Sequence, residues 1–188
     1  MVRQKTDYPI SGNINMDIDI DTPEEMTIRM RIPEWSEQTV LKINNEAITG
    51  ITPGEYVEIK RKWSSKDRIS LRLDMRGRVE IQGNDHKFAA ILRGPIVLAR
   101  DTQLPGTNLG TVISPVQDAN GNIQLIPESD ARGSVWMQYK ASFLPESYTE
   151  AGPVPVQIRL CDYASAGNGK EQSTFQVWMP QLFNPRKG

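Results

Sequence analysis

The amino-acid sequence predicts an all-β protein, built as an antiparallel β-sandwich with jelly-roll character. Apolar and polar residues alternate with a period of two in short runs along most of the chain, as in strands that bury one face. No convincing apolar stripe with the 3.6-residue period of a helix interrupts this pattern. The 13 prolines and 14 glycines separate the runs, as turn residues separate short strands.

The expected strands follow one another from the N-terminus to the C-terminus, each bounded by turn residues. The pairs Asn44-Asn45 and Asn120-Gly121 suit tight hairpin turns, because Asn and Gly tolerate the positive φ that such turns require. Neighbouring strands are therefore expected to pair antiparallel. The predicted strands are residues 12–20, 26–32, 39–44, 47–49, 55–61, 68–74, 87–92, 95–100, 110–116, 122–126, 134–142, 154–161 and 173–179.

The spacing of the strands changes after about residue 100. The segments DTQLPGTNLG and LPESYTEAGPVP are long connections rich in Pro and Gly, whereas strands follow one another closely before them. We expect a first β-sandwich domain over residues 1–100 and a second β-rich segment over residues 101–188. The alternatives are two packed sandwiches or a single larger one that is continuous through both segments.

Composition excludes several classes of function. The 22 basic and 23 acidic residues nearly balance, so the chain has no overall basic character for binding nucleic acid and no polybasic membrane patch. A single cysteine, Cys161, excludes an intrachain disulfide and a multi-cysteine metal cluster, and a single histidine, His86, excludes a two-histidine zinc site. We expect no metal and no cofactor. No targeting or membrane-spanning segment is visible in the sequence.

The stretch MDIDID places three carboxylates two residues apart, at Asp17, Asp19 and Asp21. In a strand these side chains share one face, about 6.5 to 7 Å apart, a spacing that also suits the paired acids of glycosidases. The following strand argues against catalysis, because matching the apolar faces in a hairpin sets the carboxylates opposite Arg29 and Arg31. Neighbouring cations lower the pKa of a carboxylate, which is the wrong direction for a general acid.

The same three carboxylates do not form an EF-hand. That loop requires Gly at its sixth position and Glu at its twelfth, where this chain has Thr22 and Ile28. We therefore interpret the carboxylates as a solvated, ion-paired strand face, with a weak cation site or a partner contact as alternatives. No catalytic residue is predicted here.

Two other reactive side chains have simple structural interpretations. His86 lies beside Asp85, but adjacent residues of an extended chain point to opposite sides, so a surface-loop histidine is expected. Cys161 ends the strand VQIRLC with no histidine near it in the sequence, and buried cysteines commonly serve in packing.

The four tryptophans are the remaining candidates for binding, because an exposed indole offers a flat surface on which a sugar ring can stack. In a sandwich, scattered tryptophans more often fill the core. The candidate carbohydrate-binding residues are Trp35, Trp63, Trp136 and Trp178.

Several phrases of the sequence together resemble a known enzyme family. TDYPISGNI, TIRMRIPEWSEQTVLKINNE, YVEIKRKWSSKDRISLRLDM and FAAILRGPIVLARD occur in that order, and CDYASAGNGKEQSTFQVWMP closes the chain. They resemble the C-terminal β-sandwich region of glycoside hydrolase family 127, the β-L-arabinofuranosidase-like enzymes. This chain departs from the family pattern at Ile10, where Trp is common, and at Asn45 and Lys66, where Gly is common. The likeness is strong over residues 6–101 and weaker beyond them.

The resemblance implies a region without chemistry of its own. In that family the reaction belongs to a preceding helical barrel, which supplies a glutamate and a cysteine-rich zinc site, and Cys161 matches none of those ligands. It therefore implies a non-catalytic accessory region whose partner is the helical barrel of the same or a neighbouring polypeptide. It also suggests a bacterial system that degrades plant-type glycans, in the periplasm or outside the cell.

Two alternative functions follow from the residues. The first is a carbohydrate-binding module that uses exposed Trp or Tyr side chains. The second is a small independent hydrolase that uses Asp17 and Asp19.

Overall fold

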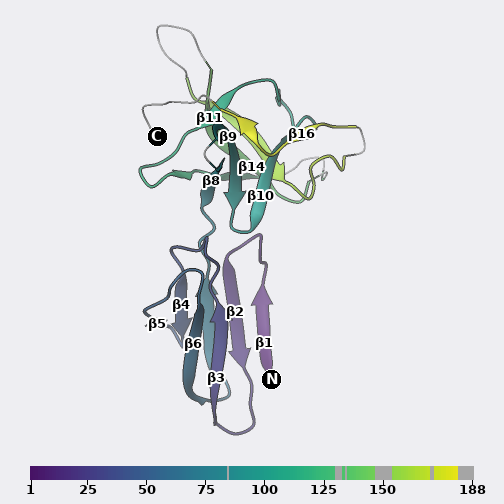
Figure 1. The fold of residues 1–188 in the computed structure, drawn as a ribbon. Helices are drawn as coiled ribbons and strands as arrows, with labels where there is room; N and C mark the ends of the chain where they lie inside the picture. The colour runs from purple at the N-terminus through teal and green to yellow at the C-terminus, as the bar shows by residue number, and fades with distance from the viewer. Residues whose placement is uncertain (84, 130–132, 134, 147–153, 170–171, 182–188) are drawn as a thin grey trace. The chain divides into compact units, whose positions relative to one another are not determined.

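The computed structural model shows an all-β protein with antiparallel sheets, which confirms the predicted fold class (Figure 1). It describes residues 1–83, 85–129, 133, 135–146, 154–169 and 172–181, and every regular element among them is a strand. No helix in this described part could cross a membrane.

The chain forms two compact units, Met1–Met75 (unit 1) and Arg76–Gly188 (unit 2). The sequence placed the division near residue 100, whereas three strands before that point pair within unit 2. Strand β10 (Ile96–Asp101) pairs with β15 (Val156–Asp162), and β8 (Gly77–Gln82) pairs with β12 (Asn122–Ile123). The long connection after residue 101 therefore joins two strands of the same sheet and does not separate the two units.

Unit 1 is a β-sandwich with layers of unequal width. Its five-stranded sheet has the order β1-β2-β7-β4-β5, and its second sheet contains only two strands, β3 and β6. All neighbours pair antiparallel. The strands are β1 (Val2–Thr6), β2 (Asn13–Ile18), β3 (Glu24–Arg31), β4 (Val40–Ile43), β5 (Glu46–Ile48), β6 (Tyr56–Trp63) and β7 (Arg68–Arg72).

The core of unit 1 lies between these two sheets. Alternate residues of each strand point inward, so that one face of each sheet is apolar and the other polar. Burying these aliphatic side chains and one indole supplies most of the driving force for folding. The buried core residues are Ile18, Met30, Ile32, Leu41, Ile43, Ile59, Trp63, Ile69, Leu71 and Leu73.

The predicted hairpin between the MDIDID strand and the strand that follows it is wrong. β2 pairs with β1 and β7, whereas β3 pairs with β6 in the other sheet. The segment 19–23 therefore carries the chain from one layer to the other, and the two apolar faces meet across the core. Matching apolar faces is equally compatible with a hairpin and with such a crossover, so alternation alone could not separate them.

One of the two predicted turns has the expected geometry. Asn44 and Asn45 have φ of 51° and 71°, and they join β4 to β5 in a two-residue hairpin. At the second site only Gly121 has a positive φ, of 79°, and the turn begins at Asp118. There the Asp118 carboxylate accepts hydrogen bonds from the backbone N–H groups of Asn120 and Asn122.

The described residues of unit 2 form one ten-stranded antiparallel sheet. The main path is β11-β14-β15-β10-β9-β8-β12, while β13 pairs with β14, β16 with β10, and β17 with β9. The strands not yet located are β9 (Asp85–Arg93), β11 (Ile113–Pro115), β13 (Ile126–Glu128), β14 (Gln138–Pro145), β16 (Phe175–Gln176) and β17 (Met179–Pro180).

Both faces of this sheet are covered at its centre. On β10, Leu98 belongs to one buried cluster and its neighbour Ala99 to another, and on β15 the same holds for Leu160 and Cys161. Because successive side chains of a strand point to opposite faces, the two clusters lie on opposite sides of the sheet.

Candidate functional site

Of the three MDIDID carboxylates, Asp17 lies on the outer face of the five-stranded sheet of unit 1, whereas Asp19 and Asp21 lie in the segment that leads to β3. Asp17 accepts a hydrogen bond from Arg68 Nε at 2.7 Å, across the β2–β7 pair. That hydrogen bond is the main reason why the pKa of Asp17 lies below its usual value, and the charges of Arg68, Lys5 and Arg3 act in the same direction. Asp19 accepts a weak hydrogen bond from Ser65 Oγ at 3.4 Å.

The partners expected for these carboxylates were wrong. Arg29 forms an ion pair of 2.9 Å with Glu58 on β6, and both Arg29 and Arg31 lie near the ring of Tyr56, at 5.4 and 6.0 Å from its centroid. The cation that pairs with Asp17 is Arg68, which is distant in the sequence and became its neighbour through the strand order.

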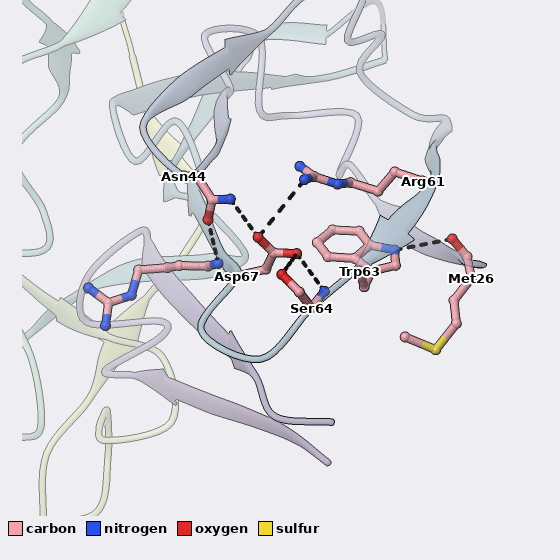
Figure 2. Close-up of polar contacts among 7 residues, drawn as sticks. Met26, Asn44, Arg61, Trp63, Ser64 and Asp67 are labelled. Carbon is pink, nitrogen blue, oxygen red and sulfur yellow. Dashed lines mark hydrogen bonds and ion pairs between the residues drawn. The ribbon is translucent and has the colours of Figure 1, made fainter. Parts of the chain in front are cut away.

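A second carboxylate, Asp67, holds together two connections of unit 1 (Figure 2). It is only 6% exposed. Asn44 Nδ2 donates to its Oδ1 at 2.6 Å, and the backbone N–H of Ser64 donates to its Oδ2 at 2.8 Å. The side-chain oxygen Oδ1 of Asn44 in turn accepts from the backbone N–H of Arg68 at 2.8 Å. Asp67 thereby links the β4–β5 turn to the β6–β7 connection.

The hydrogen bond from Asn44 is the largest influence on the pKa of Asp67 and lowers it. Burial acts in the opposite direction, but the bonds from Ser64 and the charge of Arg61, whose Nη2 lies 3.9 Å away, add to the lowering. A carboxylate stabilised in this way stays ionised and serves as an acceptor, not as an acid.

Trp63 lies directly before this network and fills the core. Its side chain is 0% exposed, its indole N–H donates to the Met26 carbonyl at 3.1 Å, and the Arg61 guanidinium lies 5.2 Å from the ring centroid (Figure 2). In the same connection Lys66 has a φ of 79°, in the left-handed region that favours glycine.

Unit 2 also contains carboxylates occupied by hydrogen bonds. Asp101 is fully buried and accepts from the backbone N–H groups of Gln103 and Gly167, at 2.9 and 2.7 Å. Burial alone would raise the pKa of Asp101, but these hydrogen bonds outweigh it and lower the pKa. Asp162 is likewise buried and accepts from the backbone N–H groups of Met137 and Ser165.

Glu128 of β13 lies in a network with the neighbouring strands. It accepts from Arg159 Nε at 2.9 Å and Gln138 Nε2 at 3.0 Å, and it forms an ion pair with Lys140. Burial acts to raise its pKa, and the bonds from Lys140, Gln138 and Arg159 lower it overall.

The four candidate tryptophans have different environments. Trp63 presents no ring face to solvent, and Trp35 is half-buried against the core of unit 1. In unit 2, Trp136 is 53% exposed just before β14, and Trp178 is 37% exposed between β16 and β17. Two further exposed aromatic residues, Tyr163 and Phe175, contact each other edge to face at 5.7 Å. Sequence reasoning did not single out these last two.

Cys161 and His86 do not extend the site. Cys161 is completely buried in a small apolar cluster of unit 2, in agreement with the packing role expected for it. His86 lies in strand β9 and not in a loop, and its side chain lies outside the described residues. Among the described residues, no three His, Cys, Asp or Glu side chains gather closely enough to hold a metal ion.

Comparison with a family model follows the division between the two units. Residues 1–75 match the model described as "Beta-L-arabinofuranosidase, GH127 middle domain". Unit 1 matches the GH127 middle domain. This agrees with the resemblance expected from the sequence phrases, and the matched residues end where unit 1 ends.

Solved structures similar to the whole chain include GH127 enzymes. One is Ara127N-Se, a GH127 beta-L-arabinofuranosidase from Geobacillus stearothermophilus T6, with a TM-score of 0.76, 22% identity and 96% of this chain covered. Another is the GH127 beta-arabinofuranosidase BT3674, with a TM-score of 0.74, 22% identity and 96% covered. A third is described as a glycoside hydrolase, with a TM-score of 0.69, 22% identity and 97% covered.

These likenesses extend the GH127-type fold beyond the middle domain into unit 2. The chain spans only 30%, 31% and 32% of the lengths of Ara127N-Se, BT3674 and the third structure. No curated protein matches the chain.

Proposed function

We propose that this chain is a non-catalytic accessory region of a glycoside hydrolase of the GH127 type, which supports a helical catalytic barrel. The observation that carries the proposal is the match of unit 1 to the GH127 middle domain. The similar solved structures, of which the chain covers about a third, support it.

The state of the carboxylates also supports this role. A general acid in a glycosidase needs a raised pKa, so that it still holds a proton at neutral pH. In contrast, hydrogen bonds and cations lower the pKa of Asp17, Asp67, Asp101 and Glu128. Each of these side chains ties strands or connections together.

Two measurements test the accessory role. The first is hydrolysis of an aryl arabinofuranoside by the 188-residue chain, for which we expect no turnover above that of the Asp17→Asn, Asp19→Asn double variant. The second compares the complete polypeptide encoded by the gene with a version that lacks these residues. We expect the complete polypeptide to hydrolyse the substrate and the shortened one to be less stable. Turnover by the chain alone that disappears in the double variant would contradict the proposal.

A second candidate function is carbohydrate binding by the exposed aromatic residues of unit 2. It is favoured by the exposure of Trp136 and Trp178, because sugar rings stack on accessible indole faces. Isothermal titration with arabino-oligosaccharides tests it. Saturable binding that is lost in Trp136→Ala or Trp178→Ala, but kept in Tyr56→Ala of unit 1, would support this function over a purely supporting role.

A further inference from the structure

The outer face of the five-stranded sheet of unit 1 concentrates positive charge. Five basic residues lie on this face: those in β4 and β7 alternate with buried residues, and those in β1 pair with Asn15 and Asp17 of β2, which point away from the core. All five are exposed. We call them the basic face: Arg3, Lys5, Lys42, Arg68 and Arg72.

The strand order brings these five residues together. Lys5 pairs with Asn15, Asn15 with Ser70, and Ser70 with Lys42, which makes one row across four neighbouring strands. With strands about 4.8 Å apart, this row spans about 14 Å between the Cα atoms of its two lysines.

A second row lies two residues away from the first in each strand. There Arg3 pairs with Asp17, and Asp17 with Arg68. On the other side of the first row, Arg72 pairs with Asn13. The basic face therefore surrounds a centre of short polar side chains.

That centre offers amide and hydroxyl groups close to the cations. The Ser70 hydroxyl donates to the side-chain oxygen Oδ1 of Asn15 at 3.0 Å, and both Asn13 and Asn15 are exposed. In the described strands of this sheet, the apolar residues that the register places beside it are Val40, opposite Arg72, and Ala47, opposite Lys42.

Positive charge on this face exceeds negative charge. Asp17 is bonded to Arg68, Asp19 lies at one end beside Ser65, and Asp74 lies past the end of β7, where it accepts from Gln38. Within residues 1–75, all of which the structure describes, the side chains of Lys42 and Arg72 have no hydrogen-bond or ion-pair partner. Two cations are thus available for an external anion.

We propose that the basic face binds an anionic glycan, a polysaccharide that carries carboxylate groups on its sugar rings. Guanidinium and ammonium groups pair with the carboxylates, and Asn13, Asn15 and Ser70 bond the sugar hydroxyls between them. The positive charge of the face indicates a polyanionic ligand. The amide and hydroxyl groups at its centre favour a glycan among the polyanions.

Two other polyanionic partners fit the face less well. Stable protein interfaces have apolar, aromatic-rich centres from which lysine is depleted, whereas this centre is Asn and Ser. Single-stranded nucleic acid binds where bases stack on aromatic rings, and none of the described residues that the register places on this face is aromatic. A glycan needs neither feature when it is held by charge and hydroxyl contacts.

Affinity electrophoresis and titration of the 188-residue chain with polygalacturonate test the proposal. We expect binding that weakens steeply between about 50 and 200 mM salt, because association releases counterions from the polyanion. Fully methyl-esterified polygalacturonate has the same sugar backbone without the charge, and we expect it not to bind. Absence of binding to polygalacturonate at low salt would overturn the proposal, and so would equal binding of the esterified polymer.

Matched variants locate the site. We expect Lys42→Gln with Arg72→Gln to weaken binding about tenfold or more and to reduce its salt dependence. The control is Lys60→Gln with Lys62→Gln on the outer face of β6, which removes the same number of exposed cations from the other sheet. All four side chains are exposed, so circular dichroism should show an unchanged fold, and the two single variants of the basic face serve if the double variant does not fold. Equal losses in the two double variants would overturn the location.

A competition experiment distinguishes an anionic glycan from single-stranded nucleic acid as the ligand. The competitors are a single-stranded oligonucleotide and free polygalacturonate, compared by their concentrations of negative charge. If the oligonucleotide displaces bound polygalacturonate at the lower of the two concentrations, the choice of ligand is overturned. The proposal stands apart from the accessory role, because a region that supports a catalytic domain need not bind a polyanion. Failure of the binding test would therefore leave the proposed accessory role intact, and failure of the accessory role would leave the proposed binding intact.

Discussion

At the scale of single residues, the informative positions in unit 1 are those where the chain departs from the family phrases. Asn45 and Lys66 stand where Gly is common, and both have positive φ, of 71° and 79°. The Cβ of either residue crowds the backbone there, but the short polar side chain of Asn can compensate by bonding the local backbone, whereas Lys has no such compensation. The family glycines are thus explained by backbone geometry, and Lys66 is the strained substitute.

Lys66→Gly is expected to stabilise unit 1. It removes a left-handed conformation that costs a non-glycine residue about 1 to 2 kcal/mol, and it adds about 0.5 to 1 kcal/mol of chain entropy to the unfolded state. The net gain of up to about 1.5 kcal/mol should raise the melting temperature by a few degrees. Lys62→Gly, within β6, is the control and should lower it. A lower melting temperature for Lys66→Gly would contradict the assigned strain.

Asp67→Asn is expected to destabilise unit 1 in a pH-dependent way. The variant loses charge-assisted hydrogen bonds to Ser64 and Asn44, for a cost of about 1.5 to 3 kcal/mol at neutral pH. Because the pKa of Asp67 is lower in the folded state, its stabilisation is fully present above the unfolded pKa of about 3.9. It is then lost as the pH falls through the folded value.

Urea unfolding of both proteins between pH 6 and pH 3 would measure this effect. The difference in stability between wild type and Asp67→Asn should be constant above about pH 5 and should shrink below about pH 4. Asp21→Asn, at an exposed position, is the control. A difference that does not change with pH would show that the carboxylate charge is not the cause.

At the scale of strands, β6 supplies both the largest buried side chain and part of the polar outer face. Trp63 closes the core at the end of the strand, while Tyr56 at its beginning is 56% exposed beneath Arg29. The same strand therefore allows two aromatic residues of opposite environment to be compared.

Trp63→Ala is expected to destabilise unit 1 by about 3 to 5 kcal/mol, because it leaves a cavity in the core and removes the bond to the Met26 carbonyl. Tyr56→Ala should cost about 1 kcal/mol or less, chiefly from the lost contact with Arg29. Chemical denaturation followed by circular dichroism measures both. Similar costs for the two variants would contradict the assignment of Trp63 to the core.

Strand-level prediction from the sequence succeeded where alternation is regular and failed elsewhere. The strands that agree with their predicted segments to within two residues at each end are β2, β3, β4, β5, β6, β7, β9, β10 and β15. β1 was missed because its sequence, VRQKT, has all five residues exposed and no apolar alternation. β8 was also missed.

At the scale of the molecule, the sequence predicted the all-β class and the supporting nature of the carboxylates, but not which strands are neighbours. The charge balance of the whole chain, −1, hides the basic face, because its residues come from positions 3, 5, 42, 68 and 72. Only the order β1-β2-β7-β4-β5 joins them. Long-range pairing of this kind depends on the packing of two sheets, which a periodic pattern in one chain does not specify.

Residues 1–75 are expected to fold without unit 2. Their core is made entirely from their own side chains, and 75 residues suffice for many single domains. A cooperative melt and dispersed amide resonances from this fragment would confirm the prediction. Residues 1–67, which lack β7, are the control and should stay unfolded. An unfolded 1–75 fragment would show that unit 2 is required.

The central place of β7 also has a consequence for synthesis. A ribosome makes β1, β2, β4 and β5 first, yet β2 and β4 become neighbours of a strand that begins only at Arg68, 51 residues after its ion-pair partner Asp17. Until β7 emerges, the nascent chain carries two unpaired strand edges that invite pairing with other chains. The five-stranded sheet of unit 1 can therefore be completed only after β7 has been synthesised, and a chaperone would be of most use in the interval before that.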